Sequence, residues 1–207
     1  MAVAYALLTT IWMNTRKVWV LLCAVWLLAA GAGAWVLSSY ENKPGTVGNT
    51  PQQWPVDTAL KIRGDKPVLV IFAHPLCPCT RASVAELNRI MGRCGDKLEV
   101  HVYFIQPENM PKDWTQTALW RSAADIPGVQ NHVDIGGQEA RRFGAESSGY
   151  ALLYDVHGRL LFHGGITSAR GHEGDNAGEN VILALVDGKS TGLDNTPVFG
   201  CGLVDQN

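Results

Sequence analysis

The chain has 207 residues, of which 17 are Lys or Arg and 19 are Asp or Glu, so that its formal net charge is −2. This near-neutral balance, without a Lys- or Arg-rich run, argues against a nucleic-acid-binding protein. The length allows one domain of ordinary size after a membrane segment.

The first predicted element is a membrane-spanning helix at Val18–Leu37, a run without charged residues that is long enough to cross a bilayer. Arg16 and Lys17 precede it, and the positive-inside rule then places the N-terminus in the cytoplasm and the rest of the chain outside. Ala32–Ala34 has the small-residue pattern of a signal-peptide cleavage site, which leaves a cleaved signal as the alternative to an uncleaved signal anchor. Both interpretations export the domain.

The sequence divides into five predicted segments. They are a cytoplasmic N-terminal segment (residues 1–17), the transmembrane helix (18–37), a linker (38–53), a folded domain (54–188) and a C-terminal tail that docks on the domain (189–207). The linker is predicted from its polar, Pro- and Gly-containing composition, which is typical of spacers. Residues 1–13 are also apolar and are interpreted as an interfacial or extra cytoplasmic-side segment.

The central stretch of the domain is a strand that runs into a Cys-Pro-Cys turn. Val68–Phe72 is β-branched and aromatic without a polar break, the pattern of a strand buried on both faces. From Thr80 the apolar period becomes helical, with Gly92 as the predicted stop. Cys77 and Cys79 therefore lie where a helix begins.

This position favours thiol chemistry. Unpaired N–H groups and the positive end of the helix dipole, with Arg81 nearby, are expected to make at least one of Cys77 and Cys79 more acidic than a free thiol. A thiolate is a nucleophile for disulfide exchange and a soft metal ligand. A disulfide between the two cysteines would close a very small ring held by Pro78, and we expect it to be strained and easily reduced.

The remaining elements follow in alternation. Strands are predicted at Leu98–Ile105, Val129–Ile135, Tyr150–Tyr154 and Leu160–His163, and helices at Lys112–Asp125, Gln138–Phe143 and Asn176–Gly188. The last two strands form a hairpin. The pattern predicts an α/β fold, a mixed sheet with helices on both faces.

The Cys turn resembles the thioredoxin superfamily, in which a strand leads to a Cys-x-x-Cys turn at a helix N-terminus. The stretches HPLCPCTRAS, GRLLFHGGITSARGHEGDN and PVFGC are most similar to the RedB-type membrane-anchored thioredoxin-like proteins of bacteria, over residues 54–203. The chain departs from the superfamily pattern because one residue, not two, separates the cysteines. A second departure is Ser147–Gly149, where the superfamily usually has a cis-proline that, as the resemblance implies, positions substrate and keeps metal from the thiols. We expect this loop to be all trans, leaving open space above the turn.

Several other residues have weaker signals. Cys201 follows an apolar Val-Phe pair, which predicts that the tail docks with Cys201 near the turn. The Gly-rich loop at residues 164–178 could hold an anion or a metal, or be a solvated loop. His101 and His132 are interpreted as structural, and Cys94 as a free thiol after a helix end; Cys23 lies within the predicted span.

Three functions follow as hypotheses. The resemblance implies a thiol–disulfide oxidoreductase in the periplasm, anchored in the bacterial inner membrane, with Cys77, Cys79 and Cys201 as its catalytic residues and protein thiols or disulfides as partners. No cofactor is expected. The alternative is a copper(I)-handling or metalloprotein-assembly factor in which Cys77 and Cys79 bind the ion, with His74, Cys201 or His163 as a third ligand. The third hypothesis is a non-catalytic scaffold that binds a partner.

Overall fold

The structure is a computed structural model that describes residues 2–203, with side chains described from residue 16 onward. The chain divides after Glu41 into two units, an N-terminal helix and a folded domain, each of which is described by itself. The predictions for the side chains of residues 1–15 and for the last four tail residues lie outside the described residues.

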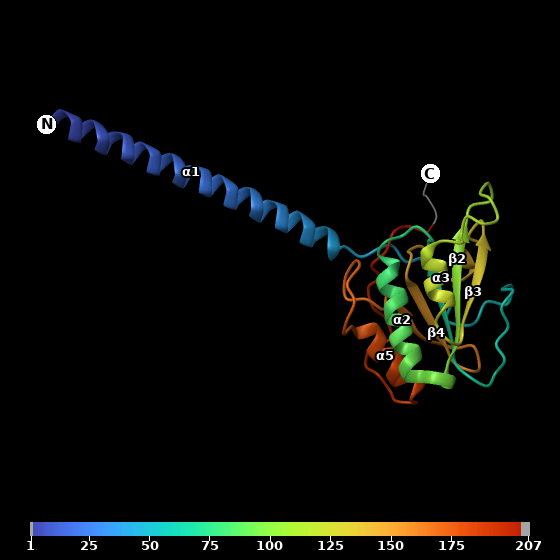
Figure 1. The fold of residues 1–207 in the computed structure, drawn as a ribbon. Helices are drawn as coiled ribbons and strands as arrows, with labels where there is room; N and C mark the ends of the chain where they lie inside the picture. The colour runs from blue at the N-terminus through green and yellow to red at the C-terminus, as the bar shows by residue number, and fades with distance from the viewer. Residues whose placement is uncertain (1, 204–207) are drawn as a thin grey trace. The chain divides into compact units, whose positions relative to one another are not determined.

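The N-terminal unit is a single helix, α1 (Ala2–Glu41) (Figure 1). Its portion Arg16–Glu41 is long and apolar enough to cross a membrane. Large apolar side chains such as Trp19, Leu28 and Trp35 are exposed along it. The helix continues beyond the predicted span into residues that were expected to belong to the linker.

The domain is built on a five-stranded mixed sheet with the order β3-β2-β1-β4-β5. The central strand β1 (Val68–Ala73) is buried along its whole length, which confirms the prediction from its unbroken apolar sequence. It pairs in parallel with β2 (Glu99–Gln106), which pairs in parallel with β3 (Val129–Ile135). On the other side β4 (Tyr150–Tyr154) and β5 (Leu160–Gly164) form the predicted antiparallel hairpin.

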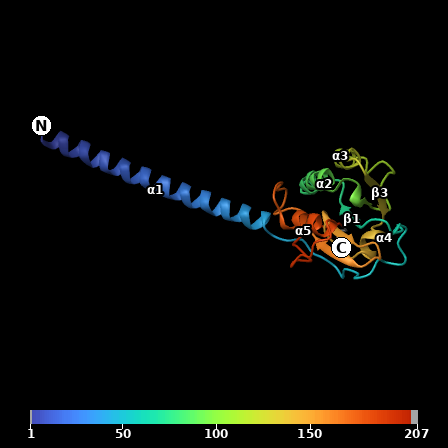
Figure 2. The same cartoon turned by 90° about the horizontal axis from the view of Figure 1, so that it is seen from below.

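Helices cover both faces of the sheet. Residues of α2 (Thr80–Cys94), α3 (Ala118–Ala124) and α5 (Ala177–Val186) pack into the core on one face. The short α4 (Gln138–Arg142) contributes to a separate core on the other face (Figure 2). A 3₁₀ turn at Gly95–Lys97 leads from α2 into β2. The layout is the thioredoxin-like mixed sheet that the order of elements predicted.

Two helix boundaries differ from the prediction. α2 runs through Gly92 and ends at Cys94, because the residue with a positive φ (54°), which interrupts the helix, is Gly95. Cys94 is consequently a buried residue of the helix, not a thiol beyond its end. The helix predicted from Lys112 begins only at Ala118, because the preceding residues form turns.

The segment expected to be a spacer packs against the domain from Gly45 onward. The Gly45 N–H donates to the Val198 carbonyl (2.8 Å), and the Gly48 N–H donates to the Gly144 carbonyl (3.0 Å). Paired backbone groups of this kind fix a segment in place. The exact domain boundaries stay predictions, but the packed unit includes part of the polar segment.

Candidate active site

The Cys-Pro-Cys turn is held by backbone hydrogen bonds between the end of β1 and the start of α2. The Cys77 N–H donates to the His74 carbonyl (3.0 Å), and the Thr80 N–H donates to the Cys77 carbonyl (3.3 Å). Cys79 occupies the N-cap position of α2, so Cys77 precedes the helix. Cys77 is only 4% exposed, which makes its thiol sensitive to each neighbouring polar group.

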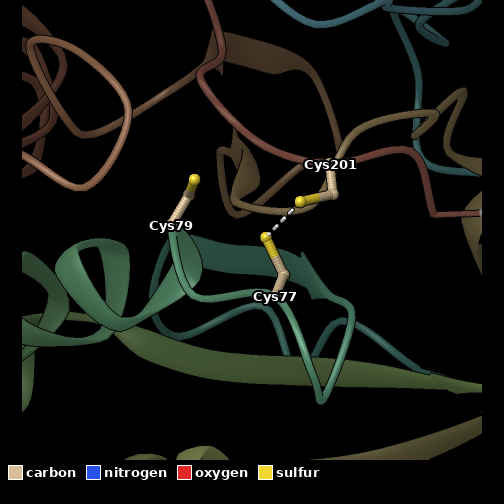
Figure 3. Close-up of side chains that lie close together, drawn as sticks. All are labelled: Cys77, Cys79 and Cys201. Carbon is tan, nitrogen blue, oxygen red and sulfur yellow. Dashed lines mark hydrogen bonds between the residues drawn. The ribbon is translucent and has the colours of Figure 1, made fainter. Parts of the chain in front are cut away.

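Three cysteine sulfurs from two distant parts of the chain meet at this turn. The sulfurs of Cys77, Cys79 and Cys201 all lie within 4.8 Å of one another. Cys201 points from the C-terminal tail toward Cys77, and their Sγ atoms are 3.0 Å apart (Figure 3). The thiols of both residues are free, so the contact is a hydrogen bond between sulfurs. The structure thus brings together the three cysteines that the sequence singled out; it does not test their catalytic role.

The tail reaches the turn because two buried apolar side chains and an isolated β-bridge anchor it. Val198 and Leu203 are buried in the core on the α4 face of the sheet. Between them, Gly202 forms an antiparallel bridge with Ser147. As far as residue 203 the tail thus lies against the domain, and this pairing supplies the backbone frame that holds Cys201.

The pKa of Cys77 is lowered from 9.0 to about 7. Burial alone would raise it, but the thiolate accepts hydrogen bonds from the side chains and backbones of Thr80 and Cys201, which outweigh the burial. The expectation that one cysteine of the turn ionises readily therefore holds for Cys77. The cause is local hydrogen bonding.

The other two thiols hold their protons more tightly. The pKa of Cys201 is raised to about 12 by burial, by its hydrogen bond to Cys77 and by the nearby Cys77 charge. Cys201 is therefore the donor and the Cys77 thiolate the acceptor in the contact between them. The pKa of Cys79 is also raised, by burial and by the charge of Cys77, although Arg170 opposes this shift. The site thus contains one nucleophilic thiolate and two protonated thiols.

Arg170 belongs to the Gly-rich loop that the sequence analysis left open as an anion site, a metal site or a solvated loop, and it lies beside the thiols. It hydrogen-bonds Cys79, and its Nη1 donates to the Gly200 carbonyl (2.7 Å), so it links the turn to the tail. Its loop is fixed to α2 because the buried Glu86 accepts from the Gly174 N–H (2.7 Å). The Gly-rich loop thus supplies the cation beside the thiols. The sequence had predicted that Arg81 would be this cation.

Ser148 occupies the place where the superfamily usually has a cis-proline. Its Oγ accepts from the His74 N–H (2.7 Å) and shares a hydrogen bond with Thr80 Oγ1 (2.5 Å). Within the described residues all peptide bonds are trans, as expected. Cys201 lies beside the turn, with its sulfur 3.0 Å from that of Cys77, so it is the candidate third ligand that the structure brings next to the two cysteines.

The histidines lie away from the sulfur cluster. His74 stacks edge-on against Trp114, and His163 Nδ1 hydrogen-bonds Tyr150 Oη (2.9 Å). In the described part of the chain, neither belongs to a group of side chains close enough to share a metal with the cysteines. His101 is buried as expected, but it is not isolated, because its Nδ1 lies 2.9 Å from Nε2 of His132.

Comparison with known proteins relates the chain to solved structures only. No protein-family model and no curated protein matches it. A hypothetical protein of Sinorhizobium meliloti has a similar structure, with 22% identity, a TM-score of 0.55 and coverage of 79% of this chain and 96% of that chain. An uncharacterized protein of Geobacillus kaustophilus has 16% identity, a TM-score of 0.57 and coverage of 79% and 94%. An exposed lipoprotein thioredoxin of Streptococcus pneumoniae is more distant, with 20% identity, a TM-score of 0.45 and coverage of 60% and 86%.

The sheet order and the helix after the central strand decide the fold. The domain is thioredoxin-like. At 22% and 16% identity the similarity extends to the fold alone, and the chemistry of the thioredoxin-like domain depends on its own cysteines.

Proposed function

We propose that the protein is a thiol–disulfide oxidoreductase whose reacting pair is Cys77 and Cys201. The observation that carries this proposal is the 3.0 Å contact between the two sulfurs, in which a thiolate faces a thiol. Thiol exchange needs a thiolate near ambient pH as the attacking group and a second thiol within reach. The site supplies both.

The reaction begins at Cys77. Its thiolate attacks one sulfur of a client disulfide, a mixed disulfide forms, and the other client sulfur leaves as a thiolate. The negative charge on Cys77 is lost in this step. Since that charge is one cause of the raised pKa of Cys201, the Cys201 proton is then released more easily.

Cys201 completes the exchange. Its thiolate attacks Cys77 Sγ, the Cys77–Cys201 bond forms, and the bond to the client sulfur breaks. The client disulfide has gained two electrons and leaves as two thiols, while the protein has lost two electrons to form its own disulfide. Cys79 belongs to the same sulfur cluster and is the alternative resolving thiol.

Single substitutions test this assignment. Cys77→Ser should abolish exchange with a peptide disulfide, whereas Cys201→Ser should allow the first attack and accumulate the mixed disulfide. Cys94→Ser is the matched control, since Cys94 is buried in the core at the far end of α2. Unchanged turnover in Cys77→Ser would refute the proposal. Accumulation of the mixed disulfide in Cys79→Ser, and not in Cys201→Ser, would show that Cys79 is the resolving thiol.

We also propose that α1 anchors the domain in the bacterial inner membrane and that the domain lies in the periplasm, as in the RedB-type proteins that the sequence resembles. The apolar Arg16–Glu41 portion supports the anchor, and the cations Arg16 and Lys17 at its start support the orientation. A reporter fused after Asn207, which lies outside the described residues, should be active only when exported. Activity of a cytoplasmic reporter would contradict the orientation.

Copper(I) binding is the second candidate function, and the three sulfurs within 4.8 Å favour it. Thiolates suit a soft ion, and Cys77, Cys79 and Cys201 would be the ligands. The reduced domain should then bind one copper(I) more tightly than the Cys77→Ser, Cys79→Ser double variant in competition with a chelator. Equal affinities would eliminate copper handling and leave exchange.

A further inference from the structure

Glu86 is a buried glutamate in the middle of α2, and the Gly-rich loop is fastened to it. Its Oε1 accepts a hydrogen bond from the Gly174 N–H (2.7 Å), and its Oε2 accepts one from the Asn176 side chain (3.4 Å). Between Arg170 and Asn176 no side chain of the loop is buried. This half of the loop therefore has no apolar anchor of its own, and Glu86 supplies the polar contacts that tie it to α2.

Arg170 lies at the start of this half of the loop, between Cys79 and the tail. It hydrogen-bonds Cys79, and its Nη1 donates to the Gly200 carbonyl (2.7 Å). Gly200 directly precedes Cys201 in the chain. The guanidinium therefore holds the peptide from which the Cys201 side chain extends.

The tail has apolar anchors on either side of this peptide. Val198 and Leu203 are buried in the core on the α4 face of the sheet. They keep the tail on the domain, and the contact of Arg170 with Gly200 fixes the stretch between them. A change at Arg170 should therefore disturb the setting of Cys201 without releasing the tail.

The charge of Arg170 acts on two of the three thiols. Burial raises the pKa of Cys79 and of Cys201, and the charge of Arg170 opposes this rise in both. The pKa of Cys77 depends instead on burial, which raises it, and on hydrogen bonds from Thr80 and Cys201, which lower it. Arg170 thus favours ionisation of the thiols that could resolve a mixed disulfide, while the acidity of Cys77 has other causes.

We propose that Arg170 is the positioning residue for the second step of exchange, the attack of Cys201 on Cys77. Glu86 acts on the same step through Arg170, because it fixes the loop. The inference rests on the proposed exchange function. It adds two residues, one of them far along α2 from the thiols, that control the resolving step and leave the first attack unchanged.

In the second step a mixed disulfide joins Cys77 to the client, and the Cys201 thiol must lose its proton. Solvent takes this proton, and the cation of Arg170 stabilises the Cys201 thiolate that remains. The thiolate then attacks Cys77 Sγ. The bond between the two cysteines forms, the bond to the client sulfur breaks, and the client sulfur leaves with the electron pair and takes up a proton.

Dithiobis-nitrobenzoate reports both steps in one stopped-flow trace of the full-length protein in detergent. The attack of Cys77 releases one nitrothiobenzoate, in a phase whose rate follows the reagent concentration. The attack of Cys201 on the mixed disulfide releases a second nitrothiobenzoate, in a phase whose rate does not depend on that concentration. All proteins carry Cys23→Ser and Cys94→Ser, which remove the thiols outside the site, and a Cys201→Ser variant identifies the second phase.

Arg170→Gln should slow the second phase about 3-fold to 30-fold and leave the first phase within about twofold. Loss of a nearby opposite charge raises a thiol pKa by about 1–3 units, and the greater nucleophilicity of the more basic thiolate offsets about half of this effect on a logarithmic scale. Glu86→Leu should have the same effect on the second phase. Glu86→Gln, which keeps an acceptor for the Gly174 N–H, should restore the rate.

A double variant separates a role through Arg170 from a general loss of packing. If Glu86 acts through Arg170, Glu86→Leu should slow the second phase no further once Arg170→Gln is present. Glu139→Leu is the matched control, since Glu139 is a buried glutamate of α4 that bonds Thr58 and Arg142. It should lower the stability of the domain and change neither phase.

The outcomes distinguish the inference from the function on which it rests. Absence of the first phase in the protein with Glu86 and Arg170 intact would refute the exchange function itself. A normal first phase with a second phase that Arg170→Gln leaves unchanged would overturn the inference, and the exchange function would survive. Equal slowing by Glu86→Leu with and without Arg170→Gln would overturn the role of Glu86. Because Arg170 is only half-buried, its variant tests the proposal even where Glu86→Leu does not fold.

Discussion

Replacement of Thr80 by valine tests the cause of the acidity of Cys77. Thr80 is buried and hydrogen-bonds the Cys77 thiolate through both its side chain and its backbone. Thr80→Val removes the side-chain bonds to Cys77 and to Ser148 and keeps the backbone bond. A hydrogen bond to a charged group contributes about 1.5–3 kcal/mol, and one pKa unit corresponds to about 1.4 kcal/mol. The pKa of Cys77 should therefore rise from about 7 to roughly 8–9.

The rate at pH 7 falls less than the thiolate fraction does. That fraction would drop by about 5-fold to 50-fold, but a more basic thiolate is a better nucleophile, which leaves a net loss of about 2-fold to 6-fold in exchange rate. The pH profile of alkylation by iodoacetamide measures the pKa directly. Thr80→Ser, which keeps the hydroxyl, is the control and should retain a pKa of about 7 for Cys77. An unchanged profile in Thr80→Val would refute the hydrogen-bond explanation.

Three further predictions concern the tail and the titration of the fold. Val198→Ala should destabilise the domain by about 2 kcal/mol in urea unfolding and, because it loosens the tail, should also raise the pKa of Cys77. The control Val181→Ala, in the core on the opposite face of the sheet, should lower the stability without changing that pKa, and equal pKa values of Cys77 in the two variants would contradict this. In the reduced protein the pKa of Cys77 is about 7, below its usual 9.0, so between these pH values the folded state releases a proton that the unfolded chain retains. The Tm of the protein should therefore rise from pH 7 to pH 9 relative to that of Cys77→Ser, and parallel Tm curves for the two proteins would contradict this linkage. Burial and the charge of His132 lower the pKa of His101, and burial lowers the pKa of His132, so the stability of the fold should decrease as the pH drops below 6.5. The decrease should be smaller in His101→Gln, and an equal decrease in the variant and the unsubstituted protein would contradict the role of the two histidines.

The parts of the site that sequence reasoning found depend on local patterns. The strand before Cys77 and the helix after Thr80 follow from apolar periodicity over a few residues, and the structure has both. The docked tail followed from apolar residues beside Cys201, since such residues rarely stay exposed next to a thiol. Val198 is indeed buried beneath the tail.

The parts that were missed depend on contacts between distant segments. The sequence named Arg170 only as part of a loop that could hold an anion. Arg170 reaches the thiols because Glu86 holds that loop through the Gly174 N–H and the Asn176 side chain, and no spacing in the sequence encodes that contact. The pairing of His101 with His132 requires the register of β2 on β3, which periodicity does not supply. The helix predicted from Lys112 begins only at Ala118, because a few apolar residues at helical spacing also fit the turns that precede it.

The disulfide of the oxidised protein is the most direct test of the central claim. Trypsin cleaves after Arg81 and after Lys189, so Cys77 and Cys79 share one peptide and Cys201 lies in another. After oxidation, mass spectrometry of the Cys79→Ser variant and of the unsubstituted protein should find the peptide of Cys77 linked to that of Cys201 in both. A disulfide confined to the Cys77–Cys79 peptide, with a free Cys201 thiol, would contradict the account.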